Sequence, residues 1–180
     1  MRRLDTADKV DGRKTFSIDL QLPGMLNASI RDTPVHGGKI KSFDAAKAKA
    51  MPGVRHVLQV GTSAVAVVAD TWWQAKTALE ALPIVWDKGE GAKVSSESIA
   101  KWLEEGLTAP TNFVGNKQGD AAAAIAGAAK KVEATYAYPY QNHACLEPMN
   151  ATVLYTPDKC EVWTSTQNGE AAYAAALAAS

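Results

Sequence analysis

"SAVAVVADTWWQAKTALEALPIVWD", from Ser63 to Asp87, is the stretch of sequence that decides the fold. Its first part, SAVAVVAD, is apolar on consecutive positions, which is typical of a strand covered on both faces or of an inner helix. The alternation of Ala and Val and the short length favour the strand. Asp70 or Thr71 then caps a helix of about three turns, and PIVWD returns as a strand. This order of elements predicts an α+β architecture with helices layered on one sheet face.

The helix inside this stretch has one apolar side. Its apolar residues follow the i, i+3, i+4 spacing of an amphipathic helix, and they are Trp72, Ala75, Leu79 and Leu82. We therefore expect Trp72 to lie in the core. Its neighbour Trp73 is expected at the surface, where it is a candidate contact with another domain.

Short strands joined by turns precede this stretch. The pattern predicts an extended run over residues 15–25, strands over 26–32, 37–44 and 54–60, and a short helix over 45–53. Asp44 is expected to cap that helix, and Pro52 and Gly53 to end it. Ile40 and Phe43 are expected near the core.

The composition changes between Lys88 and Gly119, and we place a domain boundary there, with residues 1–118 as one domain and 119–180 as the start of another. The expected elements are a capped helix over 95–106, a linker over 107–120, a helix capped by Asp120 over 119–131, a strand over 132–140, a hairpin over 151–167 and a helix over 169–180. The last helix has no Gly or Pro stop signal, so we expect a fragment or a short subunit of a larger protein.

Composition excludes several classes of partner. Apolar residues make up 47% of the chain, enough for a buried core. The 19 basic and 19 acidic residues balance, so neither nucleic acid nor an anionic membrane is expected as a partner. No apolar run approaches a membrane-spanning length. The basic N-terminal stretch MRRLDTADKVDGRK lacks the apolar region of a secretory signal, and both cytoplasm and periplasm stay open as locations.

The cysteines and glycines match no familiar cofactor motif. Cys145 and Cys160 fit no CxxC metal spacing; we expect free buried thiols, with a disulfide across the hairpin as the alternative. One His near one Cys falls short of the usual four ligands, so no zinc or iron–sulfur site built from this chain alone is expected. The glycine patterns that cradle nucleotide phosphates are absent.

The stretch PYQNHACLEPMNATVLY, residues 139–155, gathers residue types that bind metals, move protons or hold cofactors. They are Gln141, His143, Cys145, Glu147 and Met149. Pro139 and Pro148 argue against a helix, so the four-residue spacing of His143 and Glu147 does not bring them to one helix face. On the residues alone, a structural His and a surface or turn carboxylate are the favoured interpretations.

Gln167 stands in WTSTQN, where a strand ends and a helix begins. A strand-to-helix turn often faces a ligand. The alternative is that Thr166 or Asn168 caps the next helix and Gln167 is simply loop, an interpretation that Gly169 and Glu170 also fit. The residues alone leave both open.

Four short motifs, KVDG, LPGML, KIKSFD and AMPGV, follow one another between residues 9 and 54. Each is weak alone, but in this order and spacing the region resembles the start of the a/b hammerhead domain of molybdenum hydroxylases. That family includes xanthine dehydrogenase, aldehyde oxidase and the bacterial isoquinoline oxidoreductases. Residues 65–87 continue the resemblance with the paired Trp typical of the isoquinoline 1-oxidoreductase beta-subunit-like branch. The resemblance covers essentially the whole chain.

The second part of the chain resembles the entry into the family's molybdopterin-binding region. Residues 141–148 match a Q-x-H-x-x-x-E-P segment, and VWTSTQN resembles the family's STQ segment. There the Gln side chain hydrogen-bonds the apical oxo ligand of the molybdenum centre, so the resemblance implies a cofactor-binding role for Gln167. An amide N–H stabilises charge on an oxygen without changing its own protonation. His143 and Glu147 would then hold the fold, and no residue of this chain is expected to be catalytic.

The resemblance implies part of the large subunit of a molybdenum-dependent hydroxylase or dehydrogenase that oxidises an aldehyde or an N-heterocycle, with water as the oxygen source. It implies molybdopterin, in the cytosine dinucleotide form, in the complete enzyme and none bound to this chain alone. The implied partners are the remainder of the large subunit and an iron–sulfur subunit, and a cytochrome c is a further candidate. Homo-oligomers could also form through the exposed apolar surface near the C-terminus. The family's glycine-rich cofactor segment and catalytic glutamate have no match here, so the chain alone is expected to be inactive.

Two other functions stay open beside this one. The chain could serve as a free-standing hammerhead interaction or assembly module without catalysis, with its exposed Ala- and Tyr-rich C-terminal surface meeting a partner chain. An unrelated α+β domain without an active site is the third interpretation. It requires several spaced motifs to agree by accident.

Overall fold

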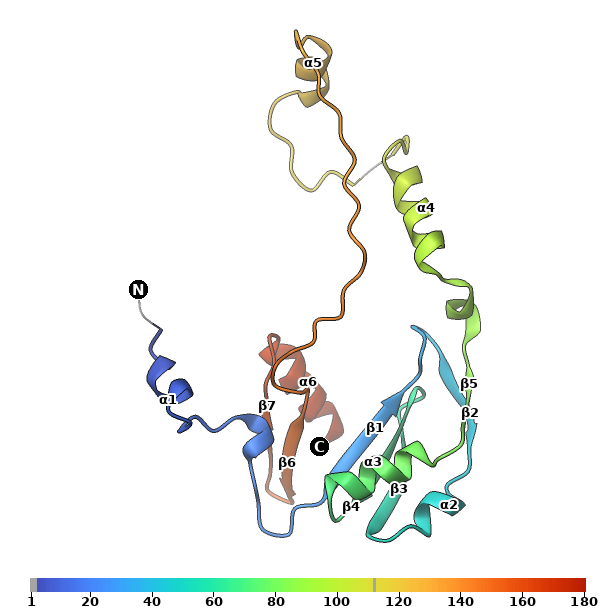
Figure 1. The fold of residues 1–180 in the computed structure, drawn as a ribbon, viewed down its shortest axis with the longest axis vertical. Helices are drawn as coiled ribbons and strands as arrows, with labels where there is room; N and C mark the ends of the chain where they lie inside the picture. The colour runs from blue at the N-terminus through green and yellow to red at the C-terminus, as the bar shows by residue number, and fades with distance from the viewer. Residues whose placement is uncertain (1–2, 112) are drawn as a thin grey trace. The chain divides into compact units, whose positions relative to one another are not determined.

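The computed structural model describes residues 3–111 and 113–180, so the first two residues of the basic N-terminal stretch and Asn112 of the expected linker lie outside the described residues. The chain divides into two compact units (Figure 1). One is Leu26–Tyr140, and the other joins Met1–Met25 to Gln141–Ser180. We call them the sheet unit and the hairpin unit and describe each by itself.

A three-stranded antiparallel sheet is the centre of the sheet unit. Its strands are β1 (Asn27–Asp32), β3 (Val54–Val60) and β4 (Ala64–Ala69), in the order β1-β4-β3. Strand β4 is central and pairs with both neighbours, which explains why a continuous apolar run is accommodated there. The predicted strand is confirmed.

Two helices cover one face of this sheet. Helix α3 (Trp72–Glu80) contacts β1, β3 and β4, and the short helix α2 (Ala46–Lys49) contacts β3. The core between them is apolar and buried, and it is formed by Ala48, Val57, Val65, Val67, Ala78, Leu79 and Leu82. The structure confirms the predicted layer of helices on one sheet face and the mixed helix-and-strand fold class.

The other face of the sheet is less covered than the sequence predicts for β4. Ala66 lies directly between Ile30 of β1 and Leu58 of β3, so these three side chains share that face. Ala66 is buried, whereas Ile30 and Leu58 are 61% and 49% exposed. The small Ala is therefore shielded by the larger side chains of the neighbouring strands, with no layer of helices above it.

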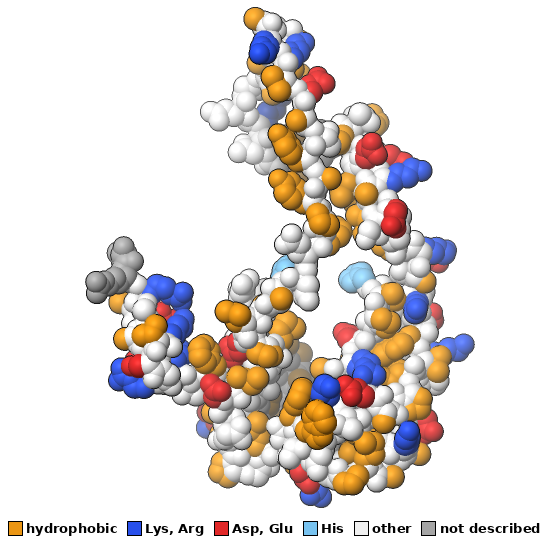
Figure 2. Space-filling model, in the orientation of Figure 1, with side chains coloured by type: hydrophobic (Ala, Val, Ile, Leu, Met, Phe, Trp, Pro, Cys, Tyr) orange, Lys and Arg blue, Asp and Glu red, His pale blue; other side chains and the backbone are white. Residues whose placement is uncertain are grey.

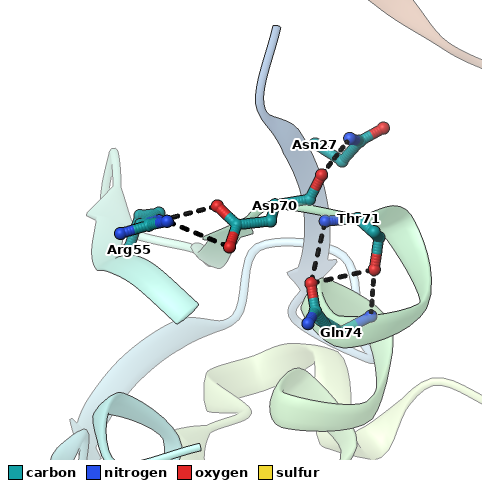
Figure 3. A network of polar contacts seen from close by, with 5 residues as sticks. All are labelled: Asn27, Arg55, Asp70, Thr71 and Gln74. Atoms are coloured by element: carbon teal, nitrogen blue, oxygen red, sulfur yellow. Dashed lines mark hydrogen bonds and ion pairs between the residues drawn. The ribbon is translucent and has the colours of Figure 1, made fainter. Parts of the chain in front are cut away.

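A polar network joins the start of α3 to the sheet (Figure 3). Thr71 caps the helix: its Oγ1 accepts the Gln74 N–H at 3.3 Å, and Gln74 Oε1 accepts the Thr71 N–H at 3.0 Å. Asp70, the other cap candidate, instead accepts two hydrogen bonds from Arg55, at 2.6 and 3.0 Å. Its backbone carbonyl accepts the side-chain N–H of Asn27 at 3.1 Å. The capping box and these contacts fix where the helix begins.

The expectation that Trp72 lies in the core is wrong. Trp72 is 54% exposed and Trp73 is 67% exposed, although Ala75 and Leu79 of the same helix are buried. Side chains of a helix lean toward its N-terminus, so a residue in the first turn projects past the start of the helix and beyond the core it would otherwise face. Trp73 contacts the Lys76 ammonium group, which lies 5.6 Å from its ring centre.

A second, two-stranded antiparallel sheet lies in the same unit. It pairs β2 (Lys39–Phe43) with β5 (Ile84–Asp87), with an irregularity between Ile40 and Ser42. Ile40 and Phe43 pack against the core, as predicted. The 3₁₀ turn η2 (Gly89–Lys93) and helix α4 (Ser96–Gly106) follow, and Ser95 caps α4 as expected.

Two stretches of the sheet unit depart from prediction. The alanine-rich helix α5 covers only Ala121–Ala126, with Asp120 as its cap, because Gly127 follows at once. Residues 132–140, expected as a strand, have no strand assignment and pair with no described strand. A strand needs a ladder partner for its backbone, and without one the alternating pattern does not suffice. Apolar side chains of this stretch lie on the visible surface (Figure 2).

The hairpin unit contains the antiparallel pair β6 (Ala151–Thr156) and β7 (Lys159–Thr164), as predicted, followed by helix α6 (Gly169–Ala179). Its N-terminal part holds helix α1 (Thr6–Val10), which the sequence pattern did not indicate.

The extended run expected over residues 15–25 is wrong, because the 3₁₀ turn η1 occupies Ser17–Asp19. The Asp19 carboxylate accepts the Phe16 N–H at 3.0 Å and folds this segment back on itself. Among the described residues of both units, no helix has the length and apolar character needed to cross a membrane.

Candidate functional site

Gln167 lies in the bend between β7 and α6, at the strand-to-helix turn that the sequence predicts. Two side chains fix this bend. Thr166 Oγ1 accepts the Asn168 N–H at 3.0 Å, and Asn168 Oδ1 accepts the Ala171 N–H at 3.0 Å. Asn168 is therefore the helix cap, and the backbone on both sides of Gln167 is held by hydrogen bonds.

The Gln167 side chain is exposed. Within the described part of the chain, no hydrogen bond to its amide is observed. An amide in this state has two N–H donors and a carbonyl acceptor available for a group outside the chain. This arrangement is compatible both with a ligand-facing amide and with a plain loop residue, so the cofactor-binding role of Gln167 stays a prediction.

A groove of about 460 Å³ lies beside this bend, between β7 and α6. Its walls are mainly apolar with a few hydroxyl groups, and they are formed by Cys160, Val162, Thr164, Thr166, Gly169, Ala172, Tyr173, Ala176, Leu177 and Ser180. Gln167 is not among the lining residues. The groove and the amide are neighbours along the chain, not one site.

Glu147 has a structural position in the hairpin unit. Its Oε1 accepts the Ile18 N–H at 3.3 Å and the Asn150 side-chain N–H at 3.4 Å. The backbone carbonyl of Asn150 accepts the Thr164 hydroxyl at 2.9 Å. Glu147 thus connects the η1 turn to the beginning of the hairpin, which is the fold-holding role that the resemblance implies for it.

Asn150 is a residue that the sequence reasoning missed. Its side-chain nitrogen also donates to the Pro148 carbonyl at 2.6 Å, which orients the amide with its oxygen facing inward. That oxygen, Oδ1, is buried and has no hydrogen-bond partner among the described residues. A buried carbonyl without a donor is uncommon. The sequence signal that could have pointed to Asn150 is its position two residues after the Glu147-Pro148 pair.

The other polar residues of the 139–155 stretch do not converge. His143, Cys145 and Met149 are exposed. No group of three or more potential metal-ligating side chains forms among the described residues. Both cysteines are free thiols, as predicted, but Cys145 is exposed and Cys160 half-buried, because the hairpin unit has too little core to bury them.

The strongest electrostatic effect in the hairpin unit lies on α1 instead. Lys9 Nζ is 2.7 Å from Asp5 Oδ2, and this hydrogen bond lowers the pKa of Asp5 to about 2. A carboxyl with so low a pKa stays ionised at any physiological pH and is unsuited to proton transfer. Asp5 is therefore not a candidate acid or base.

A family model of the molybdopterin cofactor-binding domain matches residues 106–179. This range contains the Q-x-H-x-x-x-E-P segment, Asn150 and Gln167.

Two curated relatives align with 92% of this chain. A nicotinate dehydrogenase subunit of Pseudomonas putida is 28% identical, and the beta subunit of isoquinoline 1-oxidoreductase from Brevundimonas diminuta is 29% identical. The chain spans only 14% and 22% of their own lengths.

A crystal structure of quinoline 2-oxidoreductase from Pseudomonas putida 86 has a similar fold. The TM-score is 0.65 with 19% sequence identity, over 93% of this chain and 26% of that one. At this identity the likeness concerns the fold alone. It extends over both units of the chain.

Proposed function

Since the chain belongs to the large subunits of the molybdenum hydroxylases, as its resemblance predicts, we propose that it forms part of an enzyme that oxidises an aldehyde or an N-heterocycle with water as the oxygen source. The observation that carries the proposal is the match of residues 106–179 to a molybdopterin cofactor-binding domain. The names of the two relatives, which refer to nicotinate and isoquinoline, support the N-heterocycle class. The aldehyde class comes from the resemblance to aldehyde oxidases.

Gln167 is the residue proposed to contact the cofactor. It is exposed, its amide has no partner within the described chain, and its backbone is held by the Thr166 and Asn168 side chains. A fixed backbone and a free amide are what a donor to an anionic oxygen needs, because little further ordering is then required on binding. Its role would be to donate an N–H to the oxo ligand and so orient the molybdenum centre.

The unpaired Asn150 Oδ1 provides a test of whether this segment fits a molybdopterin. A buried carbonyl oxygen requires an N–H or O–H donor, and pterins carry several N–H groups. Gln167 fits such a group as an exposed donor, whereas the buried Asn150 Oδ1 would be reached only by a group inserted between the segments that cover it. When bound, the molybdenum cofactor supplies the oxidation chemistry, while these side chains only bind and orient.

The finer assignments belong to the same proposal. Residues 1–118 are proposed to be an a/b hammerhead domain and residues 119–180 the start of the cofactor domain, and the cofactor is proposed to be the cytosine dinucleotide form. The remainder of the large subunit would supply the glycine-rich segment and the catalytic glutamate. An iron–sulfur subunit, with a cytochrome c as a further candidate, would receive the electrons.

The test is replacement of Gln167 by Ala in the complete large subunit assembled with its partners. We expect bound molybdenum to be retained, the Mo(V) paramagnetic resonance signal to change, and kcat for an N-heterocycle or aldehyde to fall by about 10²-fold or more, as for loss of one preorganised donor. The matched control is Gln21→Ala, also an exposed Gln of this unit. Unchanged signal and kcat in Gln167→Ala would remove the role of Gln167, and a complete protein without molybdenum would remove the proposed enzyme.

A further inference from the structure

A groove of about 640 Å³ lies in the sheet unit, where β2 and β5 meet the η2 turn. Its lining is Lys39, Ile40, Lys41, Trp86, Asp87, Lys88, Gly89 and Ala92. The groove combines three ammonium groups with apolar surface from Trp86, which is half-buried. It belongs to no part of the proposed cofactor segment.

The charge of the groove is locally positive although the whole chain is neutral. Lys39, Lys41 and Lys88 are exposed, and none of them forms an ion pair with another described residue. The one carboxylate in the lining, Asp87, accepts the Gly89 N–H at 3.0 Å. The lysines therefore outnumber the acidic groups three to one in the lining, and the overall charge balance conceals this excess.

Strand geometry brings the lysines together. Lys39 lies opposite Asp87, and Ile40 lies opposite Trp86 across the β2–β5 ladder. The irregularity after Ile40 leaves Lys41 as an extra residue without a cross-strand partner. Residues 39 and 41 are two positions apart, so the alternation of side chains along a strand favours the same face for both, and both line the groove.

One glycine holds the η2 wall in place. A Cβ at Gly91 would lie 2.5 Å from the His36 carbonyl oxygen. Only glycine permits this approach to the backbone, so η2 is packed tightly against the turn before β2. Lys88 and Ala92 are consequently presented to the groove by a fixed backbone, not by a loose loop.

We propose that this groove binds a small organic anion that carries two or more carboxylate or phosphate groups. The three ammonium groups would bind the charged groups, and Trp86 would contact the apolar body of the ligand. Each exposed ion pair contributes little alone, but three that converge on one multivalent anion add their contributions. Because the lysines are exposed, the affinity must fall with salt.

The experiment is a titration of the ¹⁵N-labelled 180-residue chain with inorganic pyrophosphate and, separately, with citrate, followed by amide and Trp86 indole resonances. We expect saturable shifts confined to the lining residues, and weaker binding when ionic strength rises from about 20 to about 200 mM. Whichever probe binds more tightly identifies phosphate or carboxylate as the preferred group. A third probe, hexaglutamate, represents an acidic segment of a partner protein.

The variant Lys39→Gln/Lys41→Gln/Lys88→Gln should bind about tenfold more weakly. The matched control Lys47→Gln/Lys49→Gln/Lys130→Gln removes the same charge at exposed positions outside the groove and should bind as the parent does. Equal weakening in both variants, or shifts without saturation, would overturn the proposal. Tighter binding of hexaglutamate than of either small anion would also overturn it, in favour of a protein partner.

Discussion

The sheet unit and the hairpin unit use the same apolar residue types with opposite results. In β4, Val65 and Val67 are completely buried, whereas in β6, Val153 is 55% exposed. Every buried apolar residue of the described chain lies in the sheet unit, between Ala48 and Leu82. The difference shows that local pattern produces the strand, while burial depends on what packs against it.

The cause lies in the number of neighbours. Strand β4 has a strand on each side and α3 across its face, and apolar side chains from three elements close over it. Among the described residues, strands β6 and β7 pair with each other, β6 contacts the 3₁₀ turn η1, and β7 shares a groove with α6. A two-stranded hairpin is marginal without further packing. The hairpin unit therefore leaves apolar surface exposed.

Helices α3 and α6 differ in the same way. Helix α3 has one apolar stripe, which is buried apart from Trp72, while α6 is Ala-rich on all sides and leaves Tyr173 and Leu177 70% and 64% exposed. A helix that is apolar all round is typical of an interior position. In this chain α6 has neighbours on one side only, along the groove that it forms with β7.

The largest expected effect is on the core. Leu79→Ala should lower the free energy of unfolding by about 2–5 kcal/mol, because Leu79 is almost fully buried beneath α3 and its loss leaves a cavity. Urea denaturation of the chain, together with hydrogen exchange at the β4 amides, measures this. Leu177→Ala in α6 is the matched control, and it should change the unfolding free energy by less than about 0.5 kcal/mol. Comparable losses at the two sites would show that α6 is packed as closely as α3.

A smaller effect is expected at the helix caps. Thr71→Ala removes the acceptor of the Gln74 N–H and should cost about 1 kcal/mol of unfolding free energy, while Thr71→Ser keeps the acceptor and most of the stability.

Asn168→Ala in the hairpin unit should fray α6 and change local hydrogen exchange there, with β4 protection unaffected. If Asn168→Ala also lowered β4 protection, the separation of the two units would be disproved.

The smallest effect is electrostatic. A hydrogen bond from Lys76 Nζ, 2.6 Å from Glu80 Oε1, lowers the pKa of Glu80 below its ordinary value of 4.5. Because the folded-state pKa lies below the unfolded one, the stabilisation is present above pH 4.5 and is lost as pH falls through the folded-state pKa. In Lys76→Gln the pKa should rise toward 4.5, although the charge of Arg31 still lowers it.

Carboxyl ¹³C NMR titration measures this shift. Glu97 is the internal control, since its pKa is lowered by its own backbone N–H and by Ser95, neither of which Lys76→Gln alters. A Glu80 pKa that did not move in the variant would mean that the ion pair is absent in solution.

Short-range signals account for what could be predicted. Period and capping residues located β4, α3, α4 and the β6–β7 hairpin, since each depends on hydrogen bonds within the element or its immediate turn. The position of Gln167 between a strand and a helix was predicted in the same way, while its cofactor-binding role stays a prediction from the resemblance. The hydrogen bonds that join Asn150, Glu147 and Ile18 were not predicted. They bring together residues that lie more than one hundred positions apart in the sequence.

Order along the chain by itself determined the type of most elements and the resemblance to the molybdenum hydroxylases, from which the prediction for Gln167 comes. Only the tertiary structure decided which apolar residues are buried, as Trp72 and residues 132–140 show, and which lysines gather in the β2–β5 groove. The physical reason is that hydrogen-bonded turns and strands form from neighbours in sequence. Burial and local charge depend on contacts between segments that are distant in sequence, and the pattern of residues along the chain does not specify those contacts.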